Sequence, residues 1–364
     1  MTIHGIDHVE WYVGDSRQTA YLLCTAYGFR VAGQGGPETG LGNQRSVLLR
    51  QGDINLLLTT ALNSAHPAAE YVARHGDGIA VIAFACDDAA ETFAETVSRG
   101  ATPIEPPRVY SDDDTSVTFA TVSGFGDVVH RLVTRRGRVG PFMPGAFDMI
   151  APDPETAETM LQVVDHVAVC VQAGRLDATV RYYEEVFGFR ETFQEYIEVD
   201  GQGMVSKVVQ SPSEMITFTL IEPDLARRPG QIDDFLQWHG GSGVQHVAFR
   251  TPDIVNAVRT LGTRGIKFAV TPYSYYDGLD EKVGPLERPV DDLRELGVLV
   301  DSDHWGRMYQ IFTQSMHVRR TLFLELIERH GALTFGTNNI KALYEAKERE
   351  LGRSSDLAAT ATSS

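Results

Sequence analysis

The chain has 364 residues, of which 43% are hydrophobic and 22% charged, a composition typical of a globular protein of about two domains. Its 32 basic and 49 acidic side chains leave a net charge of −17, which argues against nucleic acid or an anionic membrane surface as a partner. Three cysteines without paired spacing (Cys24, Cys86 and Cys170), no secretion signal and no long apolar run predict a cytoplasmic protein.

The opening pattern of the chain occurs twice. Residues 6–13 and 26–30 read IDHVEWYV and AYGFR, and residues 164–171 and 186–190 read VDHVAVCV and VFGFR. A further match pairs GDGIAVIAF at 76–84 with GSGVQHVAF at 241–249. Because an internal repeat of this length determines the architecture, we expect two homologous halves.

Each half is predicted to begin with a strand and a helix. From 164 to 170 alternate residues would face one side of a strand, and from 176 to 187 apolar residues recur at helical spacing. Gly188 then suits a left-handed helix end. Further strands are expected at 206–210, 216–221, 244–249, 307–313 and 321–328, with a helix within 252–265. The expected fold class is α+β, with paired strand–helix–strands modules in each half.

The predicted domain limits follow the changes in composition. Residues 1–136 form the first domain, 137–154 a linker rich in Gly, Pro and Asp, and 155–353 the second domain. The small polar residues of 354–364 predict a disordered tail.

Three residues of the second half are candidate metal ligands. His166, His246 and Glu325 each share one face of a predicted strand with small or apolar neighbours. A charged carboxylate in an apolar interior is costly unless a cation meets it. Two histidines and one carboxylate are typical of the triad that holds Fe(II), and they also hold catalytic zinc, so the residues alone leave the metal open.

The simpler interpretation is that these histidines are hydrogen-bonded core residues. In the first half Val81 stands at the position of His246, and we expect His130 at that of Glu325, so only His8 of the set is kept. We therefore predict a metal site in the second half alone and a structural role for His8. His239, His304 and His317, near predicted turns, are expected at the surface.

Four stretches of the second half resemble the 4-hydroxyphenylpyruvate dioxygenase family. They are GVQHVA at 243–248, YQIFT at 309–313, TLFLELIER at 321–329 and FGTNNIKAL at 335–343, and the resemblance extends from about residue 6 to residue 350. It implies the vicinal oxygen chelate fold, and Fe(II) held by His166, His246 and Glu325. It also implies a helix over 338–351 that closes the site.

The resemblance also identifies pocket residues and a branch of the family. Ser206, Gln231 and Gln310 match polar catalytic positions, and Phe312, Phe323, Phe335 and Asn339 match positions that enclose the substrate. Thr219, Ile221 and Ile340 stand where the homogentisate-forming branch typically has Pro, Asn and Phe. These three differences favour the branch that forms 4-hydroxymandelate from 4-hydroxyphenylpyruvate and dioxygen.

Other functions remain open at this point. They are homogentisate formation, a metal-dependent glyoxalase or catechol-cleaving activity on the same modules, and a metal-free protein that binds a small molecule. The expected partners are 4-hydroxyphenylpyruvate and dioxygen, and the sequence leaves open whether two copies form a homodimer. Supply of a peptide-antibiotic pathway is what the mandelate branch implies.

Overall fold

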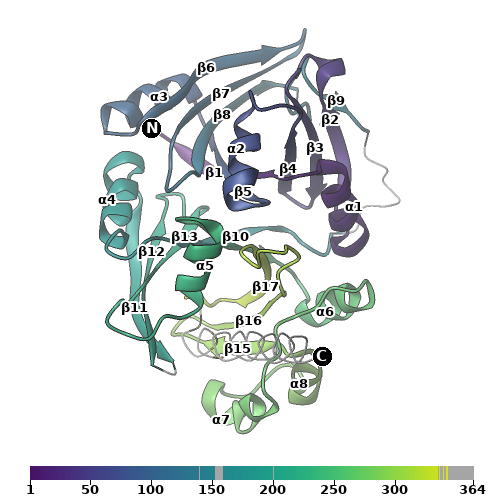
Figure 1. Ribbon diagram of the computed structural model, residues 1–364. Helices are drawn as coiled ribbons and strands as arrows, with labels where there is room; N and C mark the ends of the chain where they lie inside the picture. Colours follow the sequence, from purple (N-terminus) through teal and green to yellow (C-terminus); the bar gives the residue numbers. More distant parts are fainter. Residues whose placement is uncertain are drawn as a thin grey trace, which may run out of the picture.

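A computed structural model describes residues 1–138, 140–151, 159–199, 201–334, 336, 339 and 342. Figure 1 shows two curled mixed sheets with helices packed around them, one sheet from each half of the chain. The predicted α+β class with two vicinal oxygen chelate domains is confirmed. The predictions for residues 354–364, and most of the predicted helix at 338–351, lie outside the described residues.

The described residues of the N-terminal half form a nine-stranded sheet in the order β6-β7-β8-β5-β1-β4-β3-β2-β9. Its elements are β1 (Ile3–Tyr12), α1 (Ser16–Tyr27), β2 (Arg30–Gly35), η1 (Pro37–Thr39), β3 (Gln44–Gln51), β4 (Ile54–Ala61), α2 (Pro67–His75), β5 (Gly78–Cys86), α3 (Ala89–Ser98), β6 (Pro103–Ser111), β7 (Thr115–Ser123), β8 (Val129–Gly137) and β9 (Asp148–Met149).

The described residues of the C-terminal half form an eight-stranded sheet in the order β11-β12-β13-β10-β14-β17-β16-β15. Its elements are β10 (Val163–Cys170), α4 (Leu176–Phe187), β11 (Arg190–Val199), β12 (Gln202–Gln210), β13 (Thr217–Pro223), α5 (Gln231–His239), β14 (Gly243–Arg250), α6 (Ile254–Thr263), η3 (Tyr273–Tyr276), α7 (Leu279–Val283), α8 (Val290–Leu296), β15 (Leu299–Ser302), β16 (Arg307–Phe312) and β17 (Phe323–His330).

Strand pairing confirms the internal repeat. Strand β1 is parallel to β4 and antiparallel to β5, which is parallel to β8. Strand β10 has the same relations with β13 and β14, and β14 with β17. The four central strands of each sheet therefore correspond one to one.

The first helix of each half also matches. Helix α4 covers the predicted 176–187, and Gly188 ends it with φ 70°, just as Gly28 ends α1 with φ 76°. Glycine easily adopts this left-handed backbone conformation because it has no Cβ. Helix α6 is shorter than the predicted range 252–265. It begins at Ile254 because the carboxylate of Asp253 caps it by accepting a hydrogen bond from the Asn256 amide.

Part of the predicted linker belongs to the N-terminal sheet. Strand β9 pairs with β2, with Gly33 opposite Met149. Phe142 and Phe147 are buried in an apolar cluster with residues of β3, β7 and β8. The apolar residues between glycines and prolines therefore extend the first domain beyond residue 136.

The two sheets pack through the faces that lie opposite the curled interior. Phe84 of β5 meets Phe218 of β13 and Phe187 of α4, and these residues share one continuous apolar core. His130 of β8 crosses the same boundary, with Nε2 2.7 Å from the Tyr183 hydroxyl. Burial holds the pKa of His130 down, to about 4, so it is a neutral partner for that hydroxyl.

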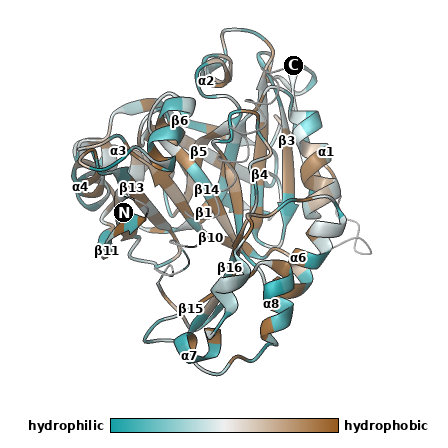
Figure 2. Ribbon diagram, turned by 60° about the horizontal axis from the view of Figure 1, so that its bottom comes forward, coloured by the Kyte–Doolittle hydropathy of each residue, from teal (hydrophilic) through white to brown (hydrophobic). Residues whose placement is uncertain are grey.

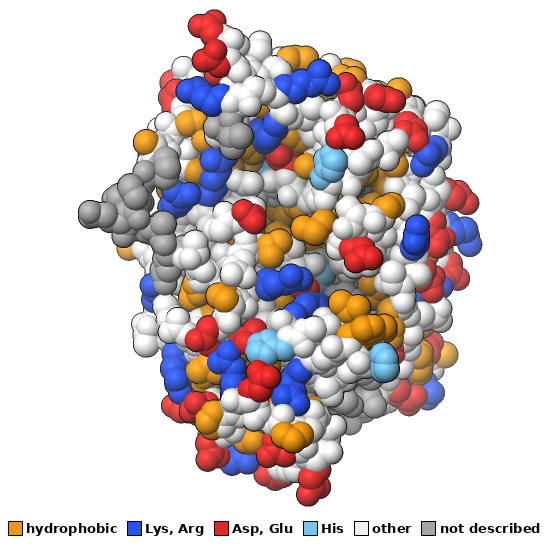
Figure 3. Space-filling view, turned by 180° about the vertical axis from the view of Figure 1, so that it is seen from behind, with side chains coloured by type: hydrophobic (Ala, Val, Ile, Leu, Met, Phe, Trp, Pro, Cys, Tyr) orange, Lys and Arg blue, Asp and Glu red, His pale blue; other side chains and the backbone are white. Residues whose placement is uncertain are grey.

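The surface is mixed in charge. In Figure 2 the strands are mainly hydrophobic in colour, while α8 shows hydrophilic residues toward the outside. Figure 3 shows acidic side chains interspersed with basic ones over the face turned away in Figure 1. Among the described residues no helix is both long and apolar enough to cross a membrane.

Helices α2 and α5 correspond in the repeat and meet at their last residues. The rings of His75 and His239 stack with centroids 4.3 Å apart. His75 Nδ1 donates to the His239 carbonyl oxygen over 2.6 Å, and its Nε2 lies 2.8 Å from Asp127. The surface position predicted for His239 is wrong, because its ring is covered by the other half; His304 is exposed and His317 is half-buried.

The substitution His75→Ala tests this contact between the halves. It removes the donor to the buried His239 carbonyl and one of the two partners of Asp127, which Arg74 still pairs, and we expect a loss of about 1–3 kcal/mol in the free energy of unfolding. Urea denaturation measures this. His4→Ala is the matched control, since His4 is exposed and pairs with Asp87, and it should cost well under about 1 kcal/mol. Equal losses in the two variants would contradict the assigned role of His75.

Candidate metal centre

Three neighbouring strands bring His166, His246 and Glu325 together. His166 of β10 lies opposite Ala248 of β14, which lies opposite Glu325 of β17. His246 is two residues before Ala248 on β14. Because side chains alternate along a strand, all three ligands project from the same face of the sheet.

The three side chains are within reach of a common atom. Glu325 Oε2 lies 3.3 Å from His166 Nε2 and 3.2 Å from His246 Nε2, and all three residues are buried. Ligands bound about 2.1 Å from one metal at right angles are separated by about 3 Å. The observed separations therefore suit three adjacent positions on one ion.

The buried carboxylate requires a positive charge. Burial opposes ionisation of Glu325, but His166 and His246 outweigh it and hold the Glu325 pKa below its usual value. Burial alone would lower the pKa of His166, but Glu325 and Asp165 raise it to about 9. A proton on His166 thus balances the negative charge of the Glu325 carboxylate. A bound divalent cation would supply this positive charge in place of the proton.

A second ring of groups orients the two imidazoles. His166 Nδ1 lies 3.0 Å from Asp165 Oδ1, and His246 Nδ1 lies 3.2 Å from Gln245 Oε1. Asp165 is itself held by Arg250 and Arg329, at distances of 2.6 and 2.8 Å. With Nδ1 engaged, each ring presents Nε2 to the centre, as metal-binding histidines commonly do.

These supporting residues are not among those predicted from the sequence. The signal for Asp165 is present, since the pair Asp165-His166 repeats Asp7-His8 at the start of the chain. Arg250 and Arg329 carry no local signal because they reach Asp165 from two other strands.

Most of the predicted pocket residues lie on the same face as the metal ligands. Thr219 and Ile221 of β13 are opposite Ala168 and Cys170 of β10, and Ser206 of β12 is opposite Ile221. Phe312 and Gln310 of β16 are opposite Glu325 and Ile327. The rings of Phe323 and Phe312 contact His246, the first stacked at 4.9 Å and the second edge-on at 5.7 Å.

Several buried polar atoms in this region have no hydrogen-bond partner among the described residues. They are Glu325 Oε1, Gln310 Oε1, Thr219 Oγ1 and Gln231 Nε2. Gln231 begins α5, a helix that contacts β10, β13 and β14. Since native proteins rarely leave buried polar atoms unpaired, this group points to a bound metal and a polar ligand.

The predicted pocket residues at the C-terminal end are only partly described. Asn339 is buried, and its Oδ1 lies 2.7 Å from the hydroxyl of Tyr275, which also accepts from the Val300 amide. Phe335 and Ile340 lie outside the described residues.

The first half has a different arrangement at the equivalent positions. Ala83 of β5 corresponds to Ala248, and it lies between His8 and Arg131. The prediction that His130 takes the place of Glu325 is wrong by one residue, and a shift of one residue turns a side chain to the other face. Arg131 takes that place, and Nη1 lies 2.6 Å from Glu10 Oε2 and 3.3 Å from His8 Nε2.

The substitution Asp165→Asn tests the supporting ring. It keeps all three candidate ligands but weakens the acceptor that orients His166, so we expect metal affinity to fall by about 10- to 100-fold. Competition with a chelator of known affinity measures this. Asp253→Asn is the matched control, because Asp253 pairs with Arg288 away from the centre and should leave affinity unchanged. An unchanged affinity in Asp165→Asn would contradict the role of Asp165.

Comparison with known proteins agrees with this geometry. Residues 1–148 match the family model described as hydroxyphenylpyruvate dioxygenase, N-terminal, and residues 163–283 match the glyoxalase/bleomycin resistance protein/dioxygenase superfamily. A 4-hydroxyphenylpyruvate dioxygenase of Yarrowia lipolytica is 33% identical over 97% of this chain and 93% of its own. One of Dictyostelium discoideum is 32% identical, over 96% and 98%.

Among solved structures, a triple mutant of 4-hydroxymandelate synthase from Streptomyces coelicolor superimposes with a TM-score of 0.86. It is 44% identical and the match covers 96% of this chain and 99% of that one. The two relatives named above match nearly the whole chain at more than 30% identity, and the chain has a His-His-Glu centre in its second half. The chain belongs to the 4-hydroxyphenylpyruvate dioxygenase family.

Proposed function

We propose that this chain is an Fe(II)-dependent enzyme that converts 4-hydroxyphenylpyruvate and dioxygen to 4-hydroxymandelate and carbon dioxide. One atom of dioxygen becomes part of the new carboxylate, which forms at the former keto carbon after carbon dioxide is lost. The other becomes the benzylic hydroxyl oxygen, so atoms and electrons balance without an added reductant. Bound Fe(II) would supply the redox chemistry that lets dioxygen react with an organic acid.

The ligand set supports iron as the metal. His166, His246 and Glu325 would hold the metal, and a set of three protein ligands would leave positions free for substrate and dioxygen. Two histidines and one carboxylate with open positions are typical of Fe(II) oxygenases. Zinc accepts the same ligands, and we favour iron because the family's members are named as dioxygenases.

The polar residues would bind and orient the substrate. Gln310 and Gln231 have buried amide atoms that no described residue pairs, and Ser206 lies opposite Ile221 on the metal-facing side of the sheet. Phe312 and Phe323 beside His246 provide an aromatic wall suited to a phenol ring. Helix α5, packed over β10, β13 and β14, would keep water from the reacting atoms.

The choice of product rests on the shape of the pocket, and Ile221 carries the proposal. This residue is buried on the metal-facing side with Ile232 and Phe235 of α5. The alkyl side chain of Ile221 offers no hydrogen bond to an intermediate on the substrate ring. It stands in place of the flat Asn amide that the homogentisate-forming branch typically has at this position. A displacement of about 1 Å changes rates by orders of magnitude, so this wall suffices to present the benzylic carbon. The 44% identity to a 4-hydroxymandelate synthase structure supports the same product.

A product assay tests the proposal. The iron-loaded protein, incubated aerobically with 4-hydroxyphenylpyruvate, should form 4-hydroxymandelate and consume one dioxygen per turnover, as measured by chromatography and an oxygen electrode. Glu325→Gln should abolish turnover and weaken iron retention. Homogentisate as the main product would show the alternative dioxygenase, and turnover without oxygen would show a glyoxalase-like enzyme. A chain that retains no iron after anaerobic loading would favour a metal-free binding protein.

The substitution Ile221→Asn tests the pocket argument. We expect benzylic hydroxylation to slow by about 10- to 100-fold, with some product diverted to homogentisate or another ring-oxidised species. The unpaired amide should also cost about 1–3 kcal/mol of stability. Ile221→Val is the matched control, since it keeps the apolar wall, and its product ratio should equal that of the unaltered chain. An unchanged product ratio in Ile221→Asn would count against Ile221 as the determinant.

A further inference from the structure

The N-terminal half contains a cavity of its own, of about 260 Å³. It lies on the face of the first sheet that carries His8, Glu10 and Arg131, the face equivalent to the metal-binding one. Helix α2 covers it as α5 covers the second sheet. Its volume equals that of roughly nine waters, which is the scale of a small organic molecule.

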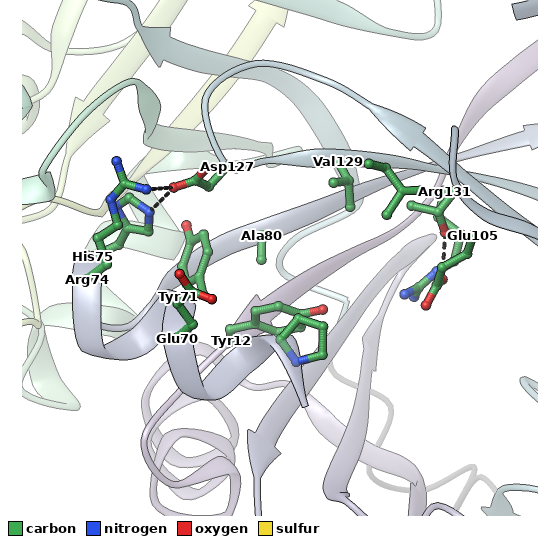
Figure 4. A pocket seen from close by; sticks show the side chains of 13 residues that line it. Tyr12, Glu70, Tyr71, Arg74, His75, Ala80, Glu105, Asp127, Val129 and Arg131 are labelled. Atoms are coloured by element: carbon green, nitrogen blue, oxygen red, sulfur yellow. Dashed lines mark hydrogen bonds and ion pairs between the residues drawn. The ribbon is translucent and has the colours of Figure 1, made fainter. Parts of the chain in front are cut away.

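The lining of this cavity divides into two charged ends and an aromatic middle (Figure 4). Glu105 and Arg131 lie at one end, and Arg74, His75 and Asp127 lie at the other. Between them are Tyr12 and Tyr71, whose rings meet edge-on at 5.5 Å, with Ala80, Val129 and the exposed Glu70 of α2 beside Tyr71.

The groups at the Arg131 end have unused hydrogen-bonding capacity. Arg131 uses Nη1 for Glu10 and His8, whereas Nε is buried without a partner and no described group accepts a hydrogen bond from Nη2. The Glu105 carboxylate is exposed and accepts one hydrogen bond, from Thr121 over 2.8 Å. A guanidinium and a carboxylate thus lie near each other at one end of the cavity.

From this juxtaposition we propose that the N-terminal cavity binds an α-amino acid with an aromatic side chain. The ligand carboxylate meets Arg131, which stands where the second half places the metal ligand Glu325. The ammonium group meets Glu105. The ring packs against the Tyr12–Tyr71 pair on the side that lines the cavity, where edge-to-face contacts between aromatic rings are favourable. A ligand with only one of the two charges engages either Arg131 or Glu105 but not both.

Calorimetric titration of the full-length, metal-loaded protein with L-phenylalanine tests this site. We expect one molecule bound per chain. 2-Phenylethylamine, which lacks the carboxylate, and 3-phenylpropionate, which lacks the ammonium group, should each bind about tenfold more weakly or worse. Absence of binding by L-phenylalanine, or equal binding of all three compounds, would overturn the proposal.

Two variants locate the binding. Glu105→Gln should weaken L-phenylalanine binding about tenfold, while Glu91→Gln, an exposed acid on α3 outside the cavity, should leave it unchanged. Glu325→Gln should also bind L-phenylalanine normally. If L-phenylalanine instead chelated the metal, its binding would be lost together with the Glu325 carboxylate. Loss of binding in Glu325→Gln, or full binding in Glu105→Gln, would overturn the assignment to the N-terminal cavity. Turnover of the unaltered chain is a separate measurement, so failure here leaves the proposed reaction unaffected.

Discussion

A carboxylate buried inside a curled sheet must be matched by a positive charge, and the Glu325 carboxylate imposes this requirement on the second half. Desolvating a charge costs several kcal/mol unless a partner compensates. Here the partners are two imidazoles 3.2 and 3.3 Å away, and each imidazole is oriented by an acceptor on its other nitrogen. This balanced cluster suits a divalent cation because the same oxygen and nitrogen atoms that share a proton can share a metal.

The first half meets the same requirement with its own side chains. Glu10 is buried there, and it accepts hydrogen bonds from Arg131 and Thr59, both over 2.6 Å. The guanidinium carries the positive charge permanently, so this half balances its acid without a metal. Two copies of one module have thus diverged at a few positions of one sheet face, while the strand pairing around those positions is preserved.

The helices that cover these two sheet faces contact each other at the boundary between the halves. Helices α2 and α5 each cover one face, and they meet where His75 stacks on His239. His75 lines the N-terminal cavity, and α5 packs on β10, β13 and β14 of the metal-binding sheet. Both faces are therefore covered by helices that meet in a buried contact of His239 with Tyr71 and His75, which explains why the His239 ring lies in the interior.

The sequence by itself determined the repeat, the α+β class and the three candidate metal ligands. Periodicity and the recurring motifs depend only on near neighbours along the chain, and they located helix α4 to the residue. Only the tertiary structure decided which residues oppose one another across strands. It placed Arg131 rather than His130 opposite Ala83, and it brought Arg250 and Arg329 to Asp165. Register and long-range ion pairs arise from packing between distant segments, and a one-residue shift reverses the face of a side chain, so local pattern cannot supply them.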